Sequence, residues 1–152
     1  MGLENEFVWR LIVAAVLGVL LGLERSLAGK HAGMRTYALV SMGSALFVCM
    51  GTLASYQLSN FISINPLQLA GSVIIGIGFI GSGLSGFRGE PPELTTASGI
   101  WVVAGVGMAA GFGFTALALA TTILGILIFS VLARVEHKLR TRFGSADNNA
   151  AG

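Results

Sequence analysis

Residues Thr36–Phe87 read TYALVSMGSALFVCMGTLASYQLSNFISINPLQLAGSVIIGIGFIGSGLSGF and contain no Asp, Glu, Lys or Arg. A second stretch without these four residue types runs from Leu94 to Ala133. A soluble domain uses about 25% charged residues to cover its surface. Two uncharged segments of this length cannot form a surface that faces water, but they can form one that faces lipid. The sequence therefore predicts an integral membrane protein.

The composition of the whole chain agrees with this class. Of 152 residues, 54% are hydrophobic and only 11% are charged, and the mean hydropathy is +0.81. The chain holds 22 glycines, a residue type that is frequent where membrane helices pack closely. One cysteine and three prolines exclude a scaffold held by disulfides. The high share of hydrophobic residues and the low share of charged ones also exclude a soluble enzyme.

Five segments have the length that a membrane-spanning helix needs, about 20 apolar residues. We expect an all-α bundle of about five such helices. The GFGF sequence at Gly111–Phe114 predicts a tight turn between the last two. Residues 1–143 are expected to form a single transmembrane domain, and residues 144–152 a disordered tail. The expected spans lie near 7–23, 37–58, 67–87, 96–112 and 115–133.

The distribution of Lys and Arg predicts the orientation. Basic residues concentrate on the cytoplasmic side of membrane proteins. With the N-terminus outside, the 24–36 loop, the 88–93 loop and the C-terminal tail are all cytoplasmic. Of the nine Lys and Arg residues, only Arg10 then lies outside. We therefore expect the N-terminus outside and the C-terminus inside a bacterial inner membrane.

After the last span, apolar residues recur at helical spacing among basic ones. This pattern predicts that the fifth helix continues to residue 143 as a basic amphipathic segment on the inner leaflet. Its apolar residues are Leu132, Val135, Leu139 and Phe143.

Small residues at four-residue spacing predict where helices approach one another, because apolar burial does not drive helices together in lipid. Packing within the chain and packing between copies both remain open. The GIGFIGSG segment (Gly76–Gly83) has a further alternative, a locally unwound helix whose free carbonyls line a site. Its G-x-G-x-x-G match is not read as a dinucleotide site, since no strand precedes it. The expected packing positions are Gly18, Gly22, Gly76, Gly78, Gly81, Ser82 and Gly105.

No carboxylate or histidine lies in the middle of a span, so we expect no catalytic residues and no enzyme activity. The polar groups concentrate at the predicted cytoplasmic face. They serve either as topology signals and helix caps, with Thr95 as an N-cap, or as a binding site. In the site hypothesis Glu24 pairs with Arg35, or joins Glu90 and Glu93 around a divalent cation, which oxygen ligands favour. The candidate binding residues are Glu24, Arg25, Arg35, Thr36, Thr95 and Thr96.

Three motifs carry a resemblance to a known family. The segment GLERSLAGKHAGMRTYALVSMGSALF (Gly22–Phe47) resembles the opening signature of the MgtC/SapB family of membrane proteins. GIGFIGSG and LTTASGIWV (Leu94–Val102) resemble two later motifs of the family, in the same order. The likeness covers roughly residues 10–135. It implies about five membrane helices and a role, usually regarded as regulatory, in magnesium limitation, acid stress or survival in a host. It also implies that Glu24, Arg25, Arg35, Thr36, Thr95 and Thr96 are the positions to test.

Two departures from the family pattern bear on function. Where relatives often carry Asp-Pro-x-Arg and a later Gln, this chain has Asn65, Pro66, Gln68 and Ser72. A family mechanism that needs that acid–base pair does not transfer here. The chain also ends before the C-terminal soluble domain of longer relatives, so we expect a short form without regulation through that domain.

Two functional hypotheses follow. The first is a non-enzymatic regulator that acts through contacts with other membrane proteins or with further copies of itself. The second is a transporter or channel for Mg²⁺ or another small solute. We expect contact with the lipid bilayer, no cofactor and no nucleic acid.

Overall fold

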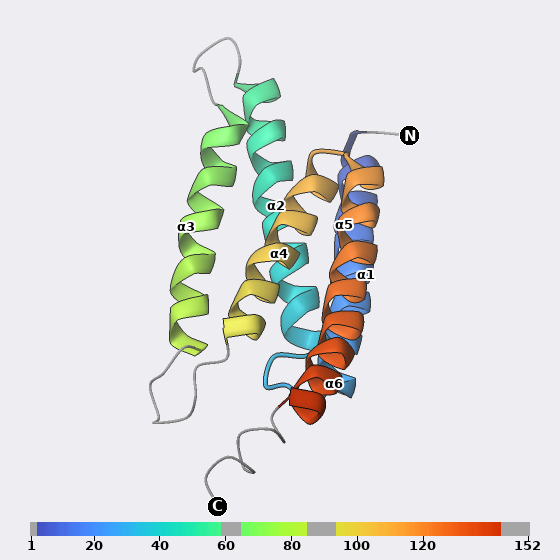
Figure 1. Cartoon of the computed structure of the whole chain (residues 1–152). Helices are drawn as coiled ribbons and strands as arrows, with labels where there is room; N and C mark the ends of the chain where they lie inside the picture. Colours follow the sequence, from blue (N-terminus) through green and yellow to red (C-terminus); the bar gives the residue numbers. More distant parts are fainter. Residues whose placement is uncertain (1–2, 59–64, 85–93, 144–152) are drawn as a thin grey trace, which may run out of the picture.

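The computed structural model describes residues 3–58, 65–84 and 94–143, and its regular elements there are helices (Figure 1). Five of them are long and apolar enough to cross a membrane, which confirms the predicted all-α class and number of spans. Helices suit these sequences because hydrocarbon offers no partner to backbone polar groups, so each must bond within its own helix. The elements are α1 (Leu3–Leu27), α2 (Met34–Gln57), α3 (Pro66–Leu84), α4 (Leu94–Gly111), α5 (Thr115–Leu127), the π-helix η1 (Ile128–Leu132) and α6 (Ala133–Phe143).

Helix α4 lies in the middle of the bundle and contacts α1, α2, α3 and α5. It is the most buried of the five spans, with 50% of its span buried inside the chain, whereas the share for α3 is 11%. Figure 1 shows α3 at one edge of the bundle and α1 with α5 at the other. The helix with the most surface left for lipid or a partner is therefore α3.

Glycines let α2 lie directly against two neighbours. A Cβ built on Gly18 of α1 would stand 2.6 Å from the carbonyl oxygen of Tyr37, and one on Gly107 of α4 would stand 2.0 Å from that of Ser41. Both distances are shorter than real Cβ contacts, so these two backbones approach only because the side chain is absent. Close backbone approach gives the van der Waals contact that holds helices together in lipid.

Two helices end in the same glycine-centred cap. Gly29 follows α1 with φ +67°, and Gly113 follows α4 with φ +87°. In each case the next residue's N–H donates back into the last turn, to the carbonyl of Arg25 (3.0 Å) or of Ala109 (2.8 Å). This is the Schellman arrangement, which requires a left-handed residue and so favours glycine. The second cap turns the chain between α4 and α5, at the Gly111–Phe114 segment where the sequence predicts a turn.

Helix α3 starts on an Asn-Pro pair. The Asn65 side-chain oxygen accepts the N–H of Leu67 at 3.0 Å, and Pro66 takes the first helical position, where its missing N–H is harmless. The helix then runs without interruption to Leu84. The alternative of an unwound segment at Gly76–Gly83 is therefore wrong, since all of these residues are α-helical.

Three further predictions concern the C-terminal tail, the continuation of the fifth span and the start of α4. The predicted tail 144–152 lies outside the described residues. The amphipathic continuation of the fifth span is observed as helix, because α5, η1 and α6 follow one another directly. Thr95 is the second residue of α4, so its predicted role as N-cap is wrong.

Candidate functional site

A buried cation lies at the end of α1. Arg25 is only 4% exposed. Its Nε donates to Oε2 of Glu24 at 2.6 Å, and its guanidinium carbon lies 4.0 Å from the centre of the Phe129 ring. A cation over an aromatic face is stabilised by the ring's negative face, by roughly 2 kcal/mol when water is excluded. The carboxylate and the ring together compensate the burial of this charge.

Tyr37 and Phe129 meet over a glycine of the central helix. A Cβ built on Gly99 would stand 2.1 Å from the hydroxyl oxygen of Tyr37 and 2.7 Å from Cζ of Phe129. Tyr37 is fully buried. Thr96, 1% exposed, lies one helical turn before Gly99 on the same side of α4. We name Glu24, Arg25, Tyr37, Thr96, Gly99 and Phe129 the arginine cluster.

Phe129 comes to this cluster from the last span. Ala118, Thr122, Gly125 and Phe129 are all buried and recur at α-helical spacing, so Phe129 continues the buried side of α5. It lies in the π-helical turn η1, and such turns occur frequently at functional sites. Phe129 was not among the predicted site residues, because hydrophobic spacing does not say which buried side chain faces a charge.

The short connection between α1 and α2 positions the other half of the cluster. Oγ of Ser26 accepts the N–H of Met34, the first residue of α2, at 3.0 Å. A Cβ on Gly33 would stand 2.2 Å from the same oxygen. The Ser26 side chain thus caps the start of α2. Tyr37, one turn later on α2, then lies beside α1. Gly22 helps, because a Cβ there would lie 2.7 Å from Cα of Met34.

The structure separates the predicted binding residues into two groups. Glu24, Arg25 and Thr96 belong to the arginine cluster. Arg35 and Thr95 are exposed, and Thr36 is half-buried. Glu24 pairs with Arg25 rather than with Arg35, so the expected Glu24–Arg35 pair is wrong.

The structure also bears on the metal hypothesis. Glu90 and Glu93 lie outside the described residues. Within the described ranges, no group of three or more His, Cys, Asp or Glu side chains could hold a metal ion. Glu24 is 18% exposed, and its Oε2 already accepts from Arg25. A cation bound there would have to compete with the guanidinium for this carboxylate.

The predicted packing positions also divide. Gly18 and Gly22 lie against α2, as described above. A Cβ on Gly81 would stand 3.8 Å from Cβ of Ala97, an ordinary contact. Around Gly76, Gly78 and Gly105, no described atom comes within 4 Å of such a Cβ. Ser82 is exposed and donates to its own helix, at the carbonyl of Phe79 (2.8 Å).

Two of the positions where the resemblance implies other residues bond to the backbone of α3. Asn65 accepts at the start of the helix, and Oγ of Ser72 donates to the backbone carbonyl of Gln68 at 3.2 Å. Asn65 thus stabilises the helix start.

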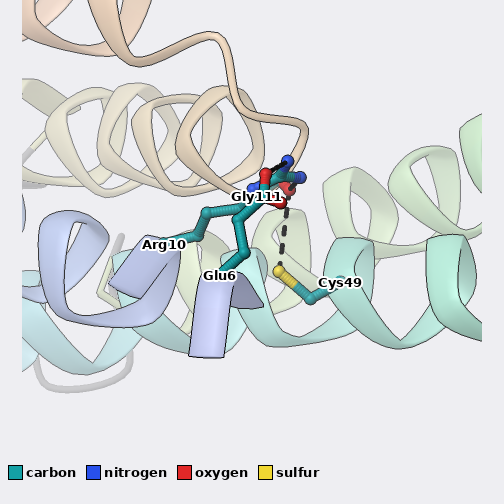
Figure 2. Close-up of polar contacts among 4 residues, drawn as sticks. All are labelled: Glu6, Arg10, Cys49 and Gly111. Carbon is teal, nitrogen blue, oxygen red and sulfur yellow. Dashed lines mark hydrogen bonds and ion pairs between the residues drawn. The ribbon is translucent and has the colours of Figure 1, made fainter. Parts of the chain in front are cut away.

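A second polar cluster joins the first half of α1 to the end of α4 (Figure 2). Arg10 pairs with Glu6, and its Nη1 donates to the carbonyl of Gly111 at 2.9 Å. The sulfur of Cys49 lies 3.6 Å from the same oxygen. Arg10 thus satisfies a free carbonyl at the end of α4 and is used structurally, which accounts for a charge placed within the first span.

Comparison with known proteins identifies the family. The sequence profile described as the MgtC family matches residues 11–138. The chain belongs to the MgtC family. The predicted resemblance to MgtC/SapB proteins is thereby confirmed. No solved structure matches the chain.

Named relatives come from several bacteria. The "Putative magnesium transporter YhiD" of Escherichia coli K12 is 36% identical over 140 residues, which are 90% of this chain and 65% of that protein. Protein SrpB of Synechococcus elongatus is 39% identical over 139 residues, 85% of this chain and 76% of that protein. Protein MgtC of Salmonella typhimurium is 36% identical over 129 residues, 84% of this chain and 52% of that protein. The chain thus spans about half to three quarters of the length of these relatives.

Proposed function

We propose that this MgtC-family protein is a non-enzymatic regulator in the bacterial inner membrane, linked to magnesium limitation, acid stress or survival in a host. It acts by contacting other membrane proteins, or further copies of itself, through its helices. We propose the orientation predicted from the basic residues, with the arginine cluster and α6 on the cytoplasmic side.

One observation carries this proposal: the outward side of α3 is rich in small residues and is uncovered. Gly71, Gly78 and Ser82 share one side of this helix with Ile75, and we name these four residues the outer face of α3. No described atom comes within 4 Å of a Cβ built on Gly71 or Gly78. Ile75 is 78% exposed. A helix surrounded only by lipid has no use for glycine, whereas a helix–helix contact does.

The experiment is photo-cross-linking in native membranes. A photoreactive phenylalanine analogue replaces Phe79, which adjoins the outer face and is 82% exposed. The proposal predicts a discrete protein adduct. Gly78→Leu should weaken the association roughly 5- to 150-fold, the factor equivalent to an overpacking cost of about 1–3 kcal/mol. The chain itself should fold normally in this variant, because the space beside Gly78 is open.

Ile123→Phe on α5 is the control, since it also adds bulk at an exposed apolar position, 50% exposed. It should leave the adduct unchanged. An adduct that persists in a folded Gly78→Leu variant would contradict the proposed contact surface.

A second candidate function is transport of Mg²⁺ or another small solute. It is favoured by two buried hydroxyls within α2: the oxygens of Ser41 and Ser44 have no hydrogen-bond partner among the described residues. Buried polar atoms without partners are costly and call for an explanation such as bound water or an ion. One named relative, YhiD, carries "magnesium transporter" in its name. Against this function, Arg25 already occupies the Glu24 carboxylate.

Flux of Mg²⁺ into proteoliposomes tests the second candidate. Transport predicts saturable flux above that of empty liposomes, with loss in a folded Ser44→Ala or Glu24→Gln variant. Absence of flux from folded protein that still yields its cross-linked adduct would favour the regulator.

A further inference from the structure

An apolar groove lies between α2 and α3 at membrane depth. Its volume is about 570 Å³. Gly43 and Gly76 open its two walls, and no described atom comes within 4 Å of a Cβ built on either glycine. The other lining residues used below are Leu39 and Ser44 on α2, and Leu69 and Ile80 on α3.

The groove results from the way the two helices meet. They touch near the loop that connects them, where a Cβ on Gly51 would stand 2.6 Å from Cδ1 of Leu69. Farther along, α3 leans on the central helix instead, with Gly81 beside Ala97 of α4. Figure 1 shows α3 and α2 close at that loop, with α4 beside them toward the other end. The groove is the space that this arrangement leaves between α2 and α3, and it faces the side of the bundle.

A positive charge lies at the end of the groove that is farther from the contact near Gly51. Leu39 and Ile80 line that end, about 17 Å from the contact near Gly51 at 1.5 Å per helical residue. Arg35 precedes Leu39 by one helical turn, so it lies on the same side of α2, and its side chain points back toward the helix start. Arg35 is exposed, and among the described residues it forms no ion pair. The apolar groove thus ends beside a guanidinium that has no ion-pair partner among the described residues.

These features fit a lipid better than a helix. A helix with side chains is about 10 Å wide. A hydrocarbon chain is thinner and needs no polar partner. Basic positions beside grooves between membrane helices are where anionic head groups bind.

We propose that the α2–α3 groove is a binding site for an anionic phospholipid, with one acyl chain along Gly43 and Gly76 and the head-group phosphate on Arg35. This site goes beyond the proposed function and does not rest on it. Acyl contacts alone give little preference, because lipid tails are as apolar as the groove. Selectivity for anionic lipid therefore comes from Arg35, whereas retention of any lipid depends on the open groove.

Native mass spectrometry of the purified full chain, mixed with equal amounts of phosphatidylglycerol and phosphatidylcholine in mild detergent, tests this site. The unaltered protein should retain one lipid and prefer phosphatidylglycerol about fivefold, the contribution of one basic residue near an anionic surface. Arg35→Gln should abolish the preference. Arg142→Gln, an exposed arginine of α6, is the matched control and should keep it.

Gly43→Leu and Gly76→Leu test the groove itself. Each should remove the retained lipid, since the leucine fills the space an acyl chain would take. Gly105→Leu is the size-matched control, because Gly105 also has no described atom within 4 Å but lies away from this groove. It should keep the lipid. Circular dichroism shows whether each variant remains helical. If a leucine variant does not fold, the double variant Gly43→Ala/Gly76→Ala replaces it, and this variant is expected to weaken lipid retention less.

Several results would overturn the proposal. They are retention of lipid by folded groove variants, a preference unchanged by Arg35→Gln, or a loss of preference with Arg142→Gln as well. The hydroxyl of Ser44 distinguishes the other occupant. A partner helix could offer that buried hydroxyl an acceptor, whereas an acyl chain cannot. Ser44→Ala should therefore leave lipid retention unchanged. If Ser44→Ala and Gly76→Leu each abolish the photo-cross-linked protein adduct, the groove holds a partner helix instead.

Discussion

Two glycines of α4, two residues apart, should respond in opposite ways to the same substitution. Gly107 faces α2, where an added Cβ would stand 2.0 Å from the carbonyl oxygen of Ser41, 2.7 Å from its carbonyl carbon and 2.9 Å from its Cα. All three are backbone atoms, so no flexible side chain can move aside. Gly105 faces open space, with no described atom within 4 Å of an added Cβ.

The geometry sets the size of the effect. Ordinary contact begins at 3.4 Å, so Gly107→Ala must separate α2 from α4 by about the difference of 1.4 Å at this point. Overpacking of this kind costs about 1–3 kcal/mol and occasionally more. Alanine also favours the helix over glycine by about 1 kcal/mol. Both variants receive this gain and only Gly107→Ala bears the overpacking cost, so they should differ in free energy of unfolding by about 1–3 kcal/mol, with Gly105→Ala the more stable.

Thermal unfolding in detergent, followed by circular dichroism, measures the difference. For a chain of this size, each kcal/mol shifts the unfolding temperature by about 2–4 °C. Gly107→Ala should therefore unfold several degrees below Gly105→Ala. Equal unfolding temperatures, or a more stable Gly107→Ala, would refute the close approach of α2 and α4 at Ser41.

Three further substitutions test individual contacts. Phe129→Leu removes the ring from Arg25 and should destabilise the fold by about 2 kcal/mol, because the cation loses its aromatic face; an unchanged unfolding temperature would contradict the stacking. Arg10→Met removes the donor to Gly111 and should cost about 1.5–3 kcal/mol, with faster hydrogen exchange in the turn after α4; unchanged exchange there would argue against this bond. Ser26→Ala should cost about 1 kcal/mol and speed exchange of the first amide of α2, while protection equal to the unaltered protein would exclude the cap.

Much of the fold follows from sequence because lipid leaves few choices. Uncharged stretches of the right length must be helices, since only helices and closed barrels satisfy the backbone in hydrocarbon. The turn after α4 could be placed because Gly113 interrupts an apolar run too long for one span. Family membership was readable from three ordered motifs, and residues 11–138 match the family.

The candidate site was only partly predictable. Glu24, Arg25 and Thr96 were identified as polar residues near span ends, where polar residues are conspicuous. The sequence left a pair between Glu24 and Arg35 open as one alternative, but the structure pairs Glu24 with its neighbour Arg25. Tyr37 directly follows the candidate residues Arg35 and Thr36 and could have been included on that ground.

By itself, the sequence determined the class, the number of spans and the family, because these depend on hydropathy, length and local motifs. Only the tertiary structure decided which glycines meet a neighbouring helix, since a stripe of small residues does not say what it faces: Gly18 meets α2, while Gly78 meets no described atom. It also decided the environment of Arg25. Phe129 of the last span stacks on that cation, and a contact between residues so far apart in the sequence is not encoded by any local pattern.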